Sequence, residues 1–214
     1  MIPNNKKFIL LKSQLIINNQ HEFINEIYKA KVKHQIHYPD KDLTFSYNIY
    51  NAFGITSPSK LFYQLFEELK PIILNYVNSE FVWLSCWINV HDNNGVEEVL
   101  DWHSHDFPYH GYISINPHKT RTAFENRNAI EAVSKYLKEG GDIGDRIVDE
   151  IVEFEIENEI GNIYLGPGNI QHKVFIDEVF DTPRVTLGFV VIDEDKASKM
   201  DTHEGFSSLI PLIK

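Results

Sequence analysis

The chain has 214 residues, 43% of them hydrophobic and 13% aromatic, and it carries a formal net charge of −11. This composition is typical of a folded globular protein and excludes a disordered chain. The acidic charge argues against duplex nucleic acid as a partner, because phosphate binding depends on a surplus of lysine and arginine. A chain of this length fits one domain, residues 1–214, and is long enough to bury a large core.

The N-terminal region and the cysteine content predict a soluble, cytoplasmic protein with no membrane partner. The apolar run at residues 8–11 has four residues, too few for a signal peptide or a membrane span. Cys86 is the single cysteine, so the chain has no internal disulfide, which fits a reducing cytosol. Because Cys86 lies among apolar residues, we expect a buried structural thiol rather than a reactive one.

Residues 1–80 predict a support made of helices and a few strands. Rough alternation over residues 6–18 favours a first strand or two, and residues 45–50 favour another. Between them, over residues 20–31, apolar side chains recur at three- and four-residue spacing, which predicts a short amphipathic helix.

A longer amphipathic helix is predicted to follow and to end near residue 78. Ser57 is its expected N-cap, with Pro58 in the first turn. Pro71 is expected to kink this helix or split it in two, because proline removes a backbone donor. The apolar stripe of the helix is typical of packing against a sheet.

The rest of the chain predicts a strand-rich core over residues 83–192 and a C-terminal tail over residues 193–214. The end of the tail, residues 209–213, is apolar, and we expect it to dock on the body. Helices first and then short strands separated by turns predict an α+β, mainly β fold, a double-stranded β-helix (jelly roll, cupin-like) with N-terminal supporting helices. The predicted strands span residues 81–90, 101–105, 109–115, 120–124, 152–156, 162–165, 173–176 and 184–192.

A pair of histidines in the segment Asp101-Trp102-His103-Ser104-His105-Asp106 predicts a metal site. His103 and His105 are two residues apart, so on a strand their side chains leave the same face and can converge on one point. A third histidine, His172, follows a Gly-Pro-Gly turn at residues 166–168 that presents it at the start of a strand.

An arginine and a threonine complete the pattern. Arg184 comes twelve residues after His172, and Thr186 shares its face if the segment is a strand. A guanidinium offers planar, bidentate recognition of a carboxylate. The competing interpretation is that Arg184 forms a surface ion pair with Asp177, Glu178 or Asp181.

The whole set, His-x-His, a distant histidine and then Arg-x-Thr, resembles the Fe(II)- and 2-oxoglutarate-dependent oxygenases over residues 83–192. The resemblance implies a double-stranded β-helix whose iron is held by His103, His105 and His172. It also implies a clamp for the cosubstrate carboxylate at Arg184 and Thr186, with Tyr112 and Asn89 as further candidate contacts. The implied reaction is hydroxylation of a substrate, with 2-oxoglutarate converted to succinate and CO2. The lists of candidate residues are therefore His103, His105 and His172 for the metal and Arg184, Thr186, Tyr112 and Asn89 for the cosubstrate.

One position departs from the pattern of that family. The second metal ligand is usually a carboxylate, and His105 stands in its place. Either the site has three histidines, or Asp101 or Asp106 replaces His105. On a regular strand Asp101 lies on the same face but farther along, and Asp106 faces away, so we predict the three-histidine set.

The other histidines and one inserted segment receive separate predictions. We expect His110 to line the site without binding the metal, and His91, His118 and His203 to face solvent. Residues 129–139 predict a helix. In the resembled family this segment would be an insertion, so residues 129–147 are either a lid over the substrate entrance or a surface feature.

Two other functions remain open. The chain could be a cupin-like metal-binding protein, a three-histidine dioxygenase or a sensor, that does not use 2-oxoglutarate, or it could be a structural jelly roll with a vestigial site. Neither explains the pair Arg184 and Thr186. The sequence indicates neither the substrate, for which a peptide, an amino acid or a small metabolite is open, nor the oligomeric state.

Overall fold

The computed structural model describes residues 8–37, 59–91, 102–125, 152–193 and 209–214. The predicted strand at residues 45–50, the predicted helix and lid at residues 129–147, Asp101 and His203 all lie outside these ranges. No helix within the described ranges is long and apolar enough to cross a membrane.

The described residues of the N-terminal part form three helices: α1 (Gln14–Asn18), α2 (Gln20–His37) and α3 (Lys60–Val77). The prediction of strands throughout residues 6–18 was wrong after residue 12, because the Ser13 hydroxyl accepts a hydrogen bond from the backbone N–H of Ile16 and so caps α1. The predicted cap of the long helix was two residues too early, since Ser59 caps α3. α3 also continues through Pro71 as a single helix, so the predicted split was wrong, and the alternative, a kink at Pro71, stays a prediction.

The strands of the described residues form two antiparallel sheets. The six-stranded sheet has the order β1-β6-β3-β8-β2-β9, and the three-stranded sheet has the order β5-β4-β7. Strands that follow one another in sequence repeatedly change sheet, as β5, β6, β7 and β8 do, and this winding is that of a jelly roll. The bounds are β1 (Ile9–Lys12), β2 (Phe81–His91), β3 (Tyr109–Asn116), β4 (Thr120–Glu125), β5 (Val152–Glu157), β6 (Asn162–Pro167), β7 (His172–Ile176), β8 (Arg184–Ile192) and β9 (Ile210–Ile213).

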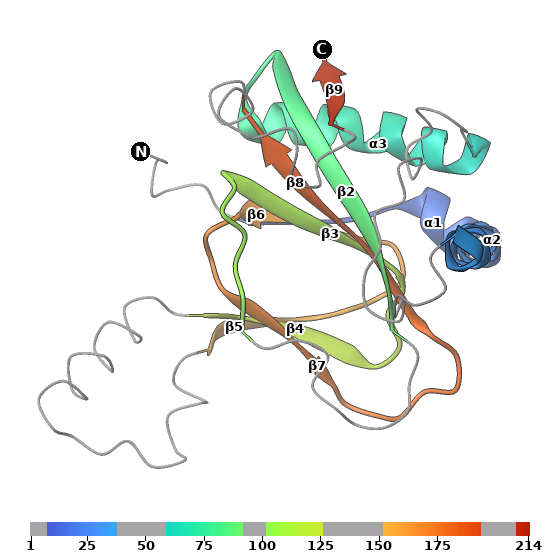
Figure 1. The fold of residues 1–214 in the computed structure, drawn as a ribbon. Helices are drawn as coiled ribbons and strands as arrows, with labels where there is room; N and C mark the ends of the chain where they lie inside the picture. Colours follow the sequence, from blue (N-terminus) through green and yellow to red (C-terminus); the bar gives the residue numbers. More distant parts are fainter. Residues whose placement is uncertain (1–7, 38–58, 92–101, 126–151, 194–208) are drawn as a thin grey trace, which may run out of the picture.

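The six-stranded sheet has one apolar face and one mixed face. Figure 1 shows the helices on the side of this sheet that faces away from the three-stranded sheet. Buried residues of α2 and α3, such as Phe23 and Leu65, form one core with Leu84, Ile88 and Phe189 of the sheet. The opposite face carries the alternate residues of the same strands and is turned toward the three-stranded sheet, as strand periodicity requires. The predicted fold class is therefore confirmed.

The C-terminal tail and the cysteine also occupy predicted places. β9 pairs with the start of β2, so the apolar end of the chain docks as an edge strand of the six-stranded sheet. Cys86 is buried in β2, and burial raises the pKa of its thiol to about 12. A thiol that stays protonated at neutral pH is a packing group rather than a nucleophile.

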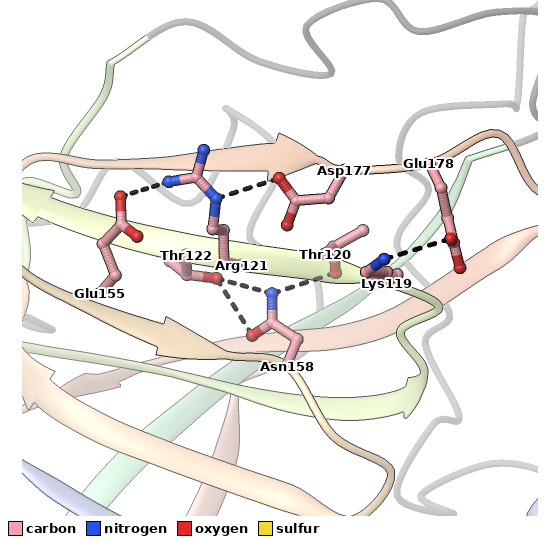
Figure 2. A network of polar contacts seen from close by, with 8 residues as sticks. All are labelled: Lys119, Thr120, Arg121, Thr122, Glu155, Asn158, Asp177 and Glu178. Carbon is pink, nitrogen blue, oxygen red and sulfur yellow. Dashed lines mark hydrogen bonds and ion pairs between the residues drawn. The ribbon is translucent and has the colours of Figure 1, made fainter.

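The three-stranded sheet is tied together on its outer face by Arg121 of β4. Its Nε donates to Asp177, just after β7, at 3.0 Å, and its guanidinium also pairs with Glu155 of β5. Figure 2 shows both contacts, together with the ion pair of Lys119 and Glu178. Such partly exposed ion pairs contribute little to stability individually. Through these two pairs, however, Arg121 connects β4 to β5 and to the end of β7.

Candidate metal centre and anion-binding cavity

Backbone hydrogen bonds bring the three candidate metal ligands together. His103 forms an isolated antiparallel bridge with His172, in which each backbone N–H donates to the other residue's carbonyl, at 3.2 and 2.9 Å. The N–H of His105 donates to the Gly168 carbonyl at 2.8 Å. One ring nitrogen of each histidine consequently lies within 4.8 Å of the corresponding atoms of the other two.

The local backbone differs from the predicted strand at residues 101–105. His103 makes a single bridge, and residues 104–108 lie outside regular strands. The Gly-Pro-Gly segment at residues 166–168 packs directly against the backbone at Phe107. A Cβ on Gly168 would meet the Phe107 carbonyl oxygen at 2.2 Å. Glycine is therefore required there, so that the two segments can pack closely enough to align His103 and His105 with His172.

No carboxylate joins this group among the residues that the structure describes. Asp106, the alternative ligand that follows His105, is exposed. Asp101 lies outside the described residues. The geometry thus brings together the three histidines and leaves Asp106 out.

The donor atoms of this group fit a transition-metal ion. His105 Nε2 is buried and has no hydrogen-bond partner in the described part of the chain. Nδ1 of His172 lies 3.4 Å from the Ile170 carbonyl, and donation through this nitrogen leaves the lone pair on Nε2. Neutral imidazole nitrogens are the donors that iron, zinc and similar divalent ions accept.

Burial keeps the imidazoles of His105 and His172 neutral. Desolvation, with a smaller effect of His103, lowers the pKa of His105 to about 4. Desolvation, followed by the effects of His103 and His105, lowers the pKa of His172 to about 3, against a small opposing effect of the Ile170 carbonyl. Neutral rings at pH 7 are ready to bind a metal without first releasing a proton.

The metal-free protein should lose stability as the pH falls from about 6.5 to about 4. In this window the unfolded chain protonates His105 and His172 while the folded chain does not, so the unfolded state binds more protons. Each fully buried histidine contributes a slope of up to about 1.4 kcal/mol per pH unit, and partly solvated His105 contributes less. Urea unfolding at several pH values would measure it. His172→Gln should make the profile shallower, and an unchanged slope in that variant would contradict the assignment.

Arg184 is a buried cation in the same region. Its side chain is 4% exposed, and its Nε has no hydrogen-bond partner within the described residues. Burial lowers the pKa of its guanidinium to about 10, and Tyr112 partly opposes this effect. Of the three carboxylates in the competing surface-pair interpretation, Asp177 binds Arg121 and Glu178 binds Lys119, and Asp181 is exposed. Leaving a buried guanidinium without an anion is costly, so this position calls for an anionic ligand.

One cavity of about 250 Å³ contains the metal group and the arginine. All seven residues that the sequence predicts for metal or cosubstrate binding line it, from the centre of the six-stranded sheet on one side and from residues 103–105 and β7 on the other. Asn89 and Thr186 are directly opposite one another on β2 and β8. The lining residues are Trp87, Asn89, His91, His103, His105, His110, Tyr112, Thr122, His172, Val174, Arg184, Thr186 and Gly188.

The cavity includes residues that were predicted differently or not at all. His91 lines it, so the prediction that His91 faces solvent was wrong, and His118 is half-buried against the Phe180 ring rather than solvent-facing. His110 lines the cavity as expected and stacks on His105 and His172, with ring centroids 4.1 and 4.7 Å apart.

Trp87 and Thr122 were not predicted as part of the site. Trp87 shares a strand face with Asn89, so the alternation of β2 could have identified it, whereas the sequence carried no signal for Thr122. Gly188 makes room for Trp87, since a Cβ there would meet the indole ring at 2.5 Å. The cavity wall therefore depends on a glycine in a central strand.

The sequence matches no protein-family profile and no curated protein. Solved structures do match. Apo HygX from Streptomyces hygroscopicus is 14% identical, over 88% of this chain and 83% of HygX, with a TM-score of 0.55. SnoN, a non-heme alpha ketoglutarate dependent epimerase from nogalamycin biosynthesis, is 8% identical, over 97% of this chain and 90% of SnoN, also with a TM-score of 0.55.

The chain has the double-stranded β-helix fold. A third structure, SnoK, a non-heme alpha ketoglutarate dependent carbocyclase from nogalamycin biosynthesis, is 10% identical over 90% of this chain and 81% of SnoK, with a TM-score of 0.50. Identities this low establish the fold, and the activity of this double-stranded β-helix has to be argued from its own cavity.

Proposed function

We propose that the protein is an Fe(II)- and 2-oxoglutarate-dependent oxygenase that hydroxylates a small-molecule or peptide substrate. One observation carries the proposal: the buried Arg184 guanidinium, which has no carboxylate partner among the described residues, lines the same cavity as three converging imidazoles. 2-Oxoglutarate matches this combination, because its keto acid end can chelate a metal while its distal carboxylate meets an arginine. His103, His105 and His172 would hold the iron, and Arg184 and Thr186 would bind the distal carboxylate, with Tyr112 and Asn89 nearby.

Three protein ligands would be enough to hold the iron and still leave room for the cosubstrate and dioxygen. A non-haem ferrous ion held by three ligands on one face has further positions open on the other. When bound, iron would activate dioxygen, one oxygen atom going to the substrate C–H bond and the other to 2-oxoglutarate, which leaves as succinate and CO2. The residues of the chain would bind and orient the cosubstrate, and the stacked rings of His110 and Trp87 would form the wall beside the metal ligands.

The solved structures support this proposal without deciding it. SnoN and SnoK are described as alpha ketoglutarate dependent enzymes, and HygX has been solved with nickel and 2-oxoglutarate bound. Those activities belong to those proteins. This chain shares their fold, and its own cavity has to carry the rest of the argument.

A second function is favoured by one observation, the metal group without a carboxylate. Three histidines also suit a cupin-like dioxygenase or sensor that binds a metal and no 2-oxoglutarate. That alternative, and that of a structural jelly roll with a vestigial site, leave the buried Arg184 unexplained. We therefore rank both below the 2-oxoglutarate-dependent oxygenase.

Addition of Fe(II) and then 2-oxoglutarate without oxygen tests the proposal. The chelate is expected to give a weak visible charge-transfer band, and oxygen should then produce succinate. A folded, iron-loaded protein that shows no band and no cosubstrate binding would favour the metal-only alternative. Screening compounds for those that stimulate succinate formation would then identify the substrate.

A further inference from the structure

Asn158 is a buried amide that connects the two sheets beside the cavity. It lies between β5 and β6 and is 5% exposed. Its Oδ1 accepts a hydrogen bond from the Tyr112 hydroxyl of β3 at 3.1 Å. Its Nδ2 donates to the Thr120 hydroxyl of β4 at 3.2 Å. The Thr122 hydroxyl, also on β4, lies 3.0 Å from Nδ2, from which it can accept, and 3.2 Å from Oδ1, to which it can donate. Figure 2 shows the amide beside the two threonines, on the side of β4 away from the Arg121 guanidinium.

Thr120 determines the orientation of this amide. A hydroxyl has one proton, and Thr120 donates its proton to the Pro117 carbonyl at 2.8 Å. Toward Asn158 it can therefore only accept, so the nitrogen of the amide faces Thr120 and the oxygen faces Tyr112. The backbone N–H of Asn158 also donates to the Thr120 carbonyl at 2.9 Å, which fixes the residue against β4. Tyr112 has to be the donor in its bond to Asn158.

The direction of the Tyr112–Asn158 hydrogen bond decides whether the Tyr112 hydroxyl acts as a donor or as an acceptor toward the cavity. Tyr112 lines the cavity, and with its proton committed to Asn158 it presents oxygen lone pairs there. Lone pairs attract a cation and repel a carboxylate. The cation that lines the same cavity is Arg184, whose Nε lacks a partner in the described ranges. A hydroxyl that donates one hydrogen bond also becomes a better acceptor of another.

We propose that Asn158 is a positioning residue: by holding the Tyr112 proton, it makes the Tyr112 oxygen an acceptor that orients the Arg184 guanidinium toward the carboxylate of 2-oxoglutarate. This inference rests on the proposed function and gives Tyr112 an indirect role instead of a direct contact with the carboxylate. The causes of the pKa shift of Tyr112 agree with this inference, because they include the charge of Arg184. Burial raises the pKa of Tyr112 to about 12, and the bond with Thr122 and the charge of Arg184 act against this rise.

The test is anaerobic calorimetry of 2-oxoglutarate binding to the Fe(II)-loaded protein, for the wild type, Asn158→Leu, Tyr112→Phe and the double variant. Leucine has the same branched shape as asparagine, although it is larger, and it cannot accept the Tyr112 proton. Each single variant should bind 2-oxoglutarate about tenfold more weakly, the effect of losing one hydrogen bond in a buried chain. The double variant should be no weaker than the singles, because both changes interrupt the same chain. Iron affinity should be unchanged in all of them.

Arg121→Gln is the matched control. Arg121 lies on β4 between Thr120 and Thr122, but it points to the outer face, so its loss removes two ion pairs and should leave the affinity for 2-oxoglutarate unchanged. Should Asn158→Leu fail to fold, Thr120→Val replaces it, because it removes the hydroxyl that orients the amide. Affinity is then expected to fall severalfold.

Three results would overturn the inference: wild-type affinity in Asn158→Leu or Thr120→Val, wild-type affinity in Tyr112→Phe, or losses that multiply to about a hundredfold in the double variant. A different result would be that the wild-type protein binds Fe(II) but does not bind 2-oxoglutarate. That result would remove the proposed function itself, and the inference with it.

Discussion

Replacing His105 with alanine should abolish iron binding. His105 supplies one of three ring nitrogens that lie within 4.8 Å of one another, and its Nε2 is buried without a partner in the described residues. Two remaining histidines would give a ferrous ion too few protein ligands for stable binding. Anaerobic titration with Fe(II), followed by calorimetry or by metal analysis after gel filtration, measures the loss. Circular dichroism would show whether the variant remains folded.

Asp106→Asn is the matched control for His105→Ala. It neutralises the carboxylate next to His105 in the chain, and because Asp106 is exposed and outside the histidine group, iron binding should be nearly intact. The opposite pattern, iron lost in Asp106→Asn or in Asp101→Asn and retained in His105→Ala, would replace the three-histidine centre with an ordinary site of two histidines and one carboxylate.

Arg184→Ala should weaken 2-oxoglutarate binding by a factor of tens or more while sparing iron. The guanidinium is buried, and losing one partner of a desolvated, hydrogen-bonded charge pair costs about 2–5 kcal/mol. Three neutral imidazoles leave the double charge of the iron in place, so the keto acid end of the cosubstrate should still be attracted to the metal. The measurement is the concentration dependence of the charge-transfer band, with iron affinity determined separately.

Arg184→Lys and Arg121→Gln show whether the effect belongs to this guanidinium. Lysine keeps the charge but loses the planar pair of donors, so its affinity should lie between those of the wild type and alanine. Arg121→Gln removes an arginine that pairs with Asp177 and Glu155 on the outer face of β4. This change should leave the affinity for 2-oxoglutarate unchanged. Equal affinities in the wild type and Arg184→Ala would mean that another group binds the carboxylate.

Side-chain alternation and short spacings were sufficient to predict much of the site. Because side chains alternate along a strand, Arg184 and Thr186 share one face of β8, and Asn89 falls on the inner face of β2. His103 and His105 also converge, but residues 104–108 lie outside regular strands, so their convergence depends on the backbone bonds to His172 and Gly168. The apolar stripes of α2 and α3 likewise identified helices that cover a sheet. Helix starts were less predictable, because Ser57 and Ser59 are both good N-caps by residue type and Ser59 is the one that caps α3.

The sequence by itself determined which side chains share a face, which turn precedes His172 and that the chain is mainly β. Only the tertiary structure decided which of these faces meet. The bridge between His103 and His172, the burial of Arg184 and the bonds of Asn158 to both sheets join residues far apart in the chain. Such contacts depend on how strands from two sheets align, and local periodicity carries no information about that alignment.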